Sequence, residues 1–101
     1  MKRKIAKKLI KIILKEFDFG KVHALMLQED WRWSDIEGDM GVPSVKTLKQ
    51  EARNLLKSVC YYGEEVDFSA SGGLCAEKRG DTLELRFEYE VVAADKKWVE
   101  E

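Results

Sequence analysis

The clearest pattern in the chain is a strict alternation of apolar and polar residues from position 82 to position 91. The apolar residues of this segment share one parity: Leu83, Leu85, Phe87, Tyr89 and Val91. Because successive side chains of a β-strand point to opposite faces, the alternation predicts one strand with a buried face and a solvent-exposed face. Residues 66–78 alternate in part, and Arg79-Gly80-Asp81 is suited to a tight turn. We therefore expect a β-hairpin of residues 66–78 and 82–92.

Helical periodicity marks three other segments. In residues 2–16, apolar residues recur every three or four positions and lysines lie opposite them, which is typical of an amphipathic helix. Asp18 is suited to cap a second, shorter helix. Ser44, directly after a proline, is suited to cap a third helix that runs to about Tyr61 and ends at Gly63.

These elements predict an α+β fold with the order α-α-β-α-β-β. The first strand is the short Trp31-Arg32-Trp33 segment, which we expect to join the hairpin in a three-stranded antiparallel sheet with helices packed on one face. We expect a single domain of residues 1–101, with a basic amphipathic helical arm (1–16), a core (17–92) and a tail (93–101). Because so small a sheet has exposed edges, we also predict a homo-oligomer.

The charges divide the chain into a basic arm and an acidic body. Residues 1–15 hold seven cations and no acid, whereas the other 86 residues hold 11 basic and 19 acidic groups, which gives charges of +7 and −8. The arm either binds a polyanion or membrane surface, or packs on its own domain with a solvated lysine face. Its candidate nucleic-acid-binding residues are Lys2, Arg3, Lys4, Lys7, Lys8 and Lys11. The third helix adds a second candidate set, Lys46, Lys49, Arg53 and Lys57.

A tryptophan and glycine set gives a second candidate site. Trp31 and Trp33 either cover the apolar face of the predicted hairpin or form an aromatic platform for a planar ligand such as a nucleotide. Gly72-Gly73 interrupts the first strand of the hairpin, which predicts a bulge or a close approach of backbone. The candidate ligand-binding residues are Trp31, Arg32, Trp33, Gly72 and Gly73.

The residues with catalytic or metal-binding chemistry are few. Two cysteines and one histidine cannot supply the four ligands of a Cys/His zinc site, and we predict no metal, no cofactor and reduced thiols. No catalytic constellation is evident, so we predict a protein that is not an enzyme; a small enzyme using His23 with Cys60 or Cys75 is an alternative. The longest apolar run, residues 12–14, is too short to span a membrane, which predicts a cytoplasmic protein.

Several segments together resemble a group of small, uncharacterised proteins encoded by bacteriophages and prophages. They are FDFGKVHALM (17–26), WRW (31–33), GVPS with the later ARNLL (41–56), SGGL (71–74) and GDTLELRFE (80–88). The resemblance implies a non-enzymatic accessory binding protein in the host cytoplasm, such as an anti-defence or host-takeover inhibitor that binds a host or defence protein or a nucleotide signal. The alternative function is nucleic-acid binding through the basic N-terminal helix.

Overall fold

The computed structural model describes residues 2–63 and 72–100. The helices are α1 (Arg3–Glu16), α2 (Phe19–Gln28), α3 (Val45–Tyr62) and α4 (Lys96–Glu100). The strands are β1 (Trp33–Asp35), β2 (Gly38–Gly41), β3 (Leu74–Arg79), β4 (Thr82–Phe87) and β5 (Glu90–Asp95). The predicted α+β fold class is confirmed. The part of the predicted hairpin that falls on residues 66–71 lies outside the described residues.

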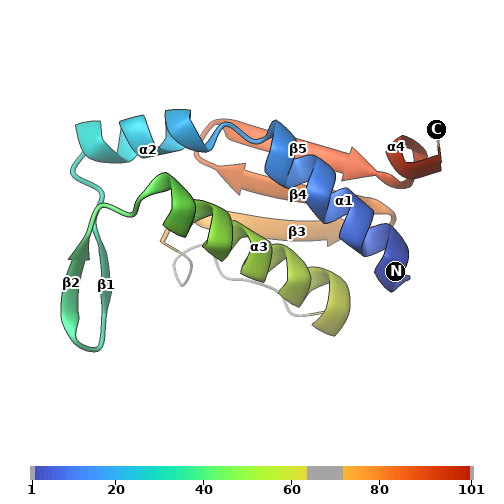
Figure 1. Cartoon of the computed structure of the whole chain (residues 1–101), viewed down its shortest axis with the longest axis horizontal. Coiled ribbons are helices and arrows are strands. Elements are labelled where there is room, and N and C mark those ends of the chain that lie inside the picture. Colours follow the sequence, from blue (N-terminus) through green and yellow to red (C-terminus); the bar gives the residue numbers. More distant parts are fainter. Residues whose placement is uncertain (1, 64–71, 101) are drawn as a thin grey trace.

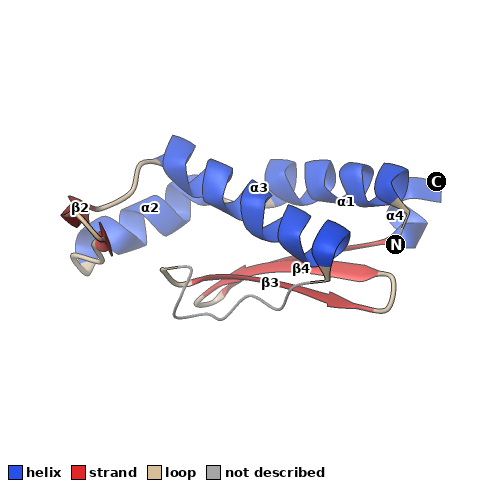
Figure 2. Ribbon diagram, turned by 90° about the horizontal axis from the view of Figure 1, so that it is seen from below, coloured by secondary structure: helices blue, strands red, loops and turns tan. Residues whose placement is uncertain are grey.

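The described chain has two layers, a sheet and a set of helices on one of its faces. Strands β3, β4 and β5 form an antiparallel meander in that order. Helices α1 and α3 lie side by side across the same face of this sheet (Figures 1 and 2). Strands β1 and β2 form a separate hairpin that projects from one end of the molecule (Figure 1). The third strand of the main sheet is therefore β5, and the prediction that the tryptophan segment joins this sheet is wrong.

The single strand predicted for residues 82–91 is in fact two strands. Phe87 pairs with Glu90 across a two-residue turn in which Glu88 adopts a positive φ of 49°. Since paired residues point to the same face, this turn moves the helix-facing parity from odd to even positions. Tyr89 is consequently 92% exposed in the turn, and Val91 lies opposite Arg86, 44% exposed. The predicted turn at Gly80-Asp81 is confirmed, since Arg79 pairs with Thr82.

The predicted helix ends are confirmed by their capping contacts. The Asp18 carboxylate accepts a hydrogen bond from the Lys21 backbone N–H at 2.9 Å and so caps α2. The Ser44 hydroxyl accepts one from the Thr47 backbone N–H at 3.2 Å and caps α3. Gly63 ends α3 in the left-handed conformation, with a φ of 65°.

The basic N-terminal helix is part of the hydrophobic core. The apolar face of α1, made of Ala6, Leu9, Ile10 and Ile13, is at most 5% exposed. These side chains join one core cluster with the apolar face of α3 and with Leu83, Leu85 and Phe87 of β4. The interpretation of residues 2–16 as a helix packed on its own domain is therefore confirmed. Residues 93–95 of the predicted tail belong to β5, and the rest of the described tail forms α4.

Candidate functional site

Four of the predicted ligand-binding residues lie close together at the base of the β1–β2 hairpin: Trp31, Trp33, Gly72 and Gly73. The Trp33 indole Nε1–H donates a hydrogen bond to the Gly72 carbonyl oxygen at 3.0 Å. The Trp31 ring packs against Phe87 of β4, with ring centroids 5.0 Å apart. A side chain at Gly73 would collide with both of these rings. The cluster thus fastens the base of the β1–β2 hairpin to the sheet, and Trp31 helps to cover the sheet's apolar face.

Arg32, between the two tryptophans, is engaged in ion pairs. Its guanidinium Nε–H donates to Asp39 of β2 at 2.7 Å, and Nη1 lies 3.4 Å from the Asp30 carboxylate. These two carboxylates raise the pKa of Arg32, the larger effect coming from Asp39. The pKa of Asp39 is lowered, first by a hydrogen bond from the Gly41 backbone N–H and then by Arg32. The Trp33 indole N–H and the Arg32 Nε–H are therefore already hydrogen-bonded to other groups of the same chain.

Gly73→Ala should destabilise the fold strongly. Gly73 has a φ of 102°, and an added Cβ would lie 2.6 Å from the Phe87 ring and 2.7 Å from the Trp31 ring. Backbone strain and overpacking each cost about 1–3 kcal/mol, so we expect a loss of at least about 2 kcal/mol in the free energy of unfolding. Urea denaturation followed by circular dichroism measures this loss.

Gly80→Ala is the matched control for that substitution. Gly80 also has a positive φ, 58°, but a Cβ there would have no atom within 4 Å. This variant carries the backbone strain without the collision, so it should be clearly more stable than Gly73→Ala. Equal losses of stability in the two variants would show that the contact with Trp31 and Phe87 is not tight.

A second candidate site is the outward surface of α1 and α3, which we call the basic helical face. On α1, Lys4, Lys8, Lys11 and Lys15 recur every three or four residues and therefore form one row along the helix. This row lies opposite the buried residues of α1. All cations of the face are exposed. They are Lys2, Arg3, Lys4, Lys7, Lys8, Lys11 and Lys15 from the N-cap and body of α1, and Lys46, Lys49, Arg53 and Lys57 from α3.

The basic helical face carries most of the positive charge of the molecule. Its 11 cations are accompanied in α1 and α3 by only two carboxylates, Glu16 and Glu51, which gives a net charge of +9. The other residues hold seven cations and 17 carboxylates, a net charge of −10. Within residues 2–63 and 72–100, no carboxylate lies within ion-pair distance of any of the 11 cations. Their positive potential is therefore not neutralised by neighbours in the described structure.

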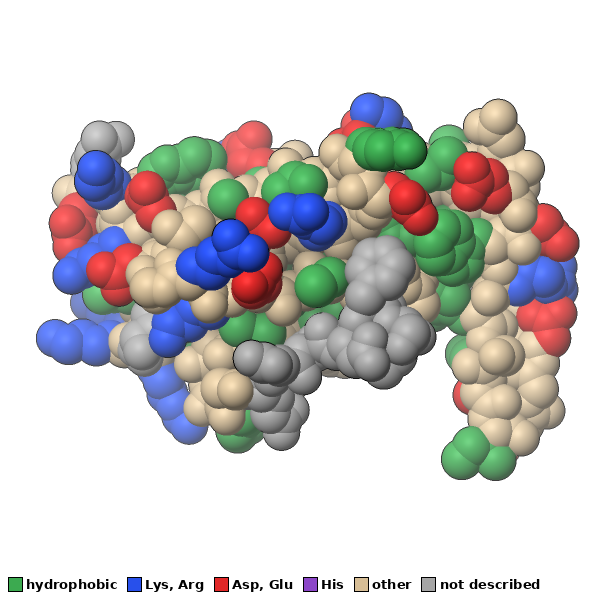
Figure 3. Space-filling model, turned by 180° about the vertical axis from the view of Figure 1, so that it is seen from behind, with side chains coloured by type: hydrophobic (Ala, Val, Ile, Leu, Met, Phe, Trp, Pro, Cys, Tyr) green, Lys and Arg blue, Asp and Glu red, His purple; other side chains and the backbone are tan. Residues whose placement is uncertain are grey.

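The opposite face of the sheet has a different charge pattern. On this face Arg86 pairs with Glu84 at 2.9 Å and Arg79 pairs with Glu77 at 3.0 Å. Figure 3 shows acidic and basic side chains interspersed over this side of the molecule. Paired charges of both signs present little net potential, so the charge asymmetry belongs to the helical side.

The structure joins the two predicted basic sets, although Lys11 at the end of the first and Lys46 at the start of the second are 35 positions apart in the sequence. Lys2, Arg3, Lys4, Lys7, Lys8 and Lys11 were predicted as one set and the α3 cations as another; the contact between α1 and α3 makes them one surface. Lys15 also belongs to this surface and was missing from the predicted set. Its spacing of four residues from Lys11 was the signal that identifies it.

The candidate catalytic residues, His23, Cys60 and Cys75, are not brought together by any described contact with one another. His23 Nδ1 lies 2.8 Å from the Pro43 carbonyl oxygen, a hydrogen bond that ties α2 to the start of α3. Cys60 is buried on α3, and burial raises the pKa of its thiol; it forms no disulfide with Cys75. Among the described residues, no cluster of three His, Cys, Asp or Glu side chains is arranged to hold a metal ion. None of the described helices has the length and apolar character needed to cross a membrane.

Comparison with known proteins leaves the site to be interpreted from its own geometry. No protein-family model, curated protein or solved structure matches this chain.

Proposed function

We propose that this is a binding protein whose basic helical face binds the phosphate backbone of a nucleic acid. The observation that carries the proposal is the concentration of 11 exposed cations on two adjacent helices with a net charge of +9. Lys and Arg side chains that neutralise phosphates release condensed counterions, and this release drives binding without regard to sequence.

The dimensions of the face suit an extended polyanion. The α1 lysines recur from Lys4 to Lys15, a distance of about 16 Å along the helix at 1.5 Å per residue. Duplex DNA advances about 3.4 Å per phosphate along one strand, so this length matches about five phosphates. The α3 cations run beside them from Lys46 to Lys57. A strand lying along the helices would therefore contact several cations at once.

The acidic remainder of the molecule supports this orientation. Its net charge of −10 disfavours the approach of a polyanion from sides other than the helical layer. The open sheet face, with its paired charges, offers no competing site among the described residues. We therefore expect a single binding mode, with the helical layer toward the nucleic acid.

Salt dependence tests the proposal. For about six phosphate contacts, the affinity for a fluorescein-labelled mixed-sequence oligonucleotide should fall by about a thousandfold between roughly 50 and 200 mM salt. Fluorescence anisotropy measures this change, with labelled dextran as an uncharged control polymer that should not bind. An absence of oligonucleotide binding at low salt, or an affinity that does not change with salt, would contradict the proposal.

The resemblance to phage-encoded proteins supports a second proposal, an accessory inhibitor that acts in the host cytoplasm as a homo-oligomer. The observation that favours it is the projecting β1–β2 hairpin, where Ile36 is fully exposed and Met40 is 61% exposed. In this proposal, Trp31, Arg32, Trp33, Gly72 and Gly73 contribute to binding a host or defence protein or a nucleotide. Native mass spectrometry of the purified protein tests the nucleotide and the oligomer: both are supported by a multimer with a nucleotide-sized adduct and contradicted by a bare monomer.

A further inference from the structure

The basic helical face carries two rows of cations, one on each helix. The row of α1 is Lys4, Lys8, Lys11 and Lys15, and the row of α3 is Lys46, Lys49, Arg53 and Lys57. Residues three or four positions apart share one side of a helix, so each row follows a single side. Both rows extend over about 16 Å at 1.5 Å per residue. The face therefore presents two lines of positive charge of equal length.

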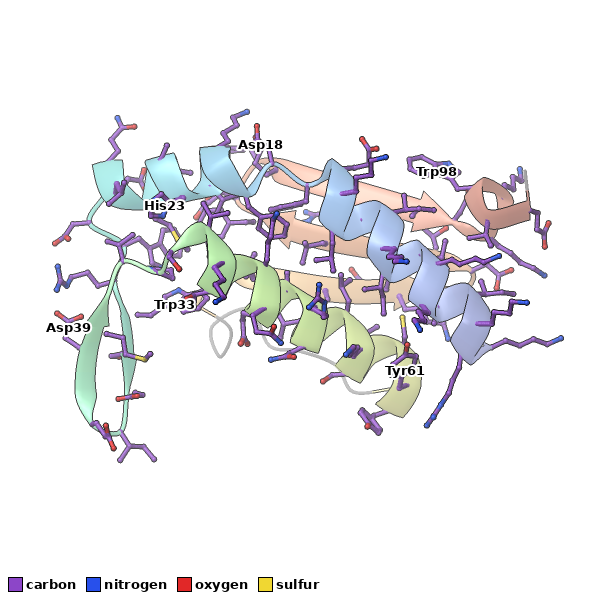
Figure 4. All side chains as sticks on the ribbon, in the orientation of Figure 1. Asp18, His23, Trp33, Asp39, Tyr61 and Trp98 are labelled. Carbon is purple, nitrogen blue, oxygen red and sulfur yellow. The ribbon has the colours of Figure 1, made fainter. Side chains whose placement is uncertain are left out.

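Two contacts with aromatic rings show which way the α3 row faces. Arg3 of α1 lies over the Tyr61 ring of α3, with its guanidinium carbon 5.5 Å from the ring centroid, and Figure 4 shows Tyr61 beside the start of α1. The first turn of α1 thus contacts the last turn of α3, and the two helices run antiparallel. Lys49 lies 6.0 Å from the centroid of the Phe19 ring, at the start of α2. The α3 row therefore lies on the side of α3 that faces α1 and α2 (Figure 1).

The two carboxylates of α1 and α3 lie on the outer sides of this helix pair. At about 100° per residue, Glu51 lies about 160° around α3 from Lys49, and Glu16 lies about 140° around α1 from Arg3. No carboxylate of either helix therefore separates the two rows of cations.

The rows offer phosphate contacts without a surface for base stacking. Sites for single-stranded nucleic acids combine a basic surface with aromatic side chains on which the bases stack. In α1 and α3, both described in full, the aromatic residues are Tyr61 and Tyr62. Arg3 covers the Tyr61 ring, and Tyr62 lies about 140° around α3 from Lys49, on the side away from the α3 row. Contacts to the backbone alone suit a duplex, whose bases are already stacked on one another.

The charge of the face also matches two nucleic-acid strands better than one. Over about 16 Å, one strand with a phosphate every 3.4 Å or so offers about five phosphates, whereas a duplex with a charge every 1.7 Å or so offers about nine. The net charge of the face is +9. A single strand would therefore leave about half of these cations without a phosphate.

We infer that the ligand of the basic helical face is a nucleic-acid duplex, with one strand along the α1 row and the other along the α3 row. Packed helices lie about 8–10 Å apart, and the minor and major grooves of B-DNA are about 6 and 12 Å wide. The cations of each helix, at the ends of long side chains, therefore reach phosphates of different strands across one groove. The inference rests on the proposed nucleic-acid-binding function and specifies its ligand.

The test compares one labelled oligonucleotide as a single strand and annealed to its complement, by fluorescence anisotropy at roughly 0.1 M salt. With at least two more phosphate contacts, each worth about eightfold at this concentration, wild type should bind the duplex at least about 60-fold more tightly than the single strand. Glutamine at all four positions of the α3 row removes the second set of contacts, so the ratio of the two affinities should fall at least about tenfold. The control is glutamine at four cations outside the face, which should leave this ratio unchanged: Lys21, Arg32, Arg79 and Arg86.

The outcomes separate this inference from the function on which it rests. If wild type binds neither form, the proposed function fails. If it binds the single strand at least as tightly as the duplex, the inference is overturned and the proposed function stands. The inference is also overturned if the α3 variant keeps the full preference for the duplex, or if the control variant loses it equally. Since all the replaced cations of the α3 row are exposed, the variant should fold, and circular dichroism checks that it does.

Discussion

Replacing Lys4, Lys8, Lys11 and Lys15 with glutamine should weaken nucleic-acid binding by about 4,000-fold at roughly 0.1 M salt, if each lysine contacts one phosphate. Each lost phosphate contact removes about 0.9 from the slope of log affinity against log salt, which is close to an eightfold loss at this concentration. The slope itself should become shallower by about three to four. Fluorescence anisotropy over a salt series measures both quantities. Glutamine keeps helix propensity close to that of lysine, so the fold should persist.

The matched control neutralises four cations outside the basic helical face. Glutamine at Lys21, Arg32, Arg79 and Arg86 gives the same change in net charge, at positions that are paired with carboxylates. This control variant should retain most of the affinity and nearly the same salt slope. If the two quadruple variants lose affinity equally, net charge and not the helical face governs binding, and the assignment of the site is wrong.

The double substitution Leu9→Ala with Ile13→Ala should leave the protein largely unfolded. Both side chains are completely buried in α1 and join the core cluster of the sheet and α3. Each large-to-small substitution in a core costs about 2–5 kcal/mol, so the pair should cost about 4–10 kcal/mol, which is comparable to the whole stability of a small domain. Circular dichroism at 25 °C and a urea titration measure the loss.

A control on the other side of α1 separates burial from helix formation. Lys8→Ala with Lys15→Ala changes exposed positions of the same helix, and alanine favours helix at least as well as lysine. Its free energy of unfolding should stay within about 0.5 kcal/mol of wild type for each substitution. If the Leu9 and Ile13 variant were equally stable, α1 would be a detachable arm and the described packing would be incorrect.

Local features of the fold were predictable because they depend on neighbours in sequence. The caps at Asp18 and Ser44, the helix end at Gly63 and the turn at Gly80 each rest on hydrogen bonds or backbone angles within a few residues. The periodicity of residues 2–16 predicted the helix and the burial of Leu9 and Ile13, but Ile5 and Ile12 are only half-buried, and Ala6 and Ile10 are buried instead. The two-residue turn at Glu88-Tyr89 was not predicted, because neither residue is typical of a turn and the parity pattern continues across it.

The candidate site was predictable only in parts. The sequence supplied the lysine spacing of α1 and the cations of α3, but it does not say which helices are neighbours. Gly72-Gly73 was correctly expected to mark a close approach to the backbone, but its partners were not predictable, because the Trp33–Gly72 hydrogen bond and the Trp31–Phe87 contact join segments about 40 residues or more apart. Such contacts depend on how the chain closes on itself, which residue pattern alone does not specify.

The sequence by itself therefore determined the three longer helices, the caps of α2 and α3, part of the buried faces and the uneven charge of the chain, since each follows from local periodicity and composition. Only the tertiary structure decided that β5 completes the sheet, that the tryptophan segment forms a separate hairpin, and that α1 and α3 lie side by side. The physical reason is that burial of the two apolar helix faces on one side of a single sheet leaves both lysine faces outward on the same side. The basic helical face is thus a consequence of packing that neither helix has alone.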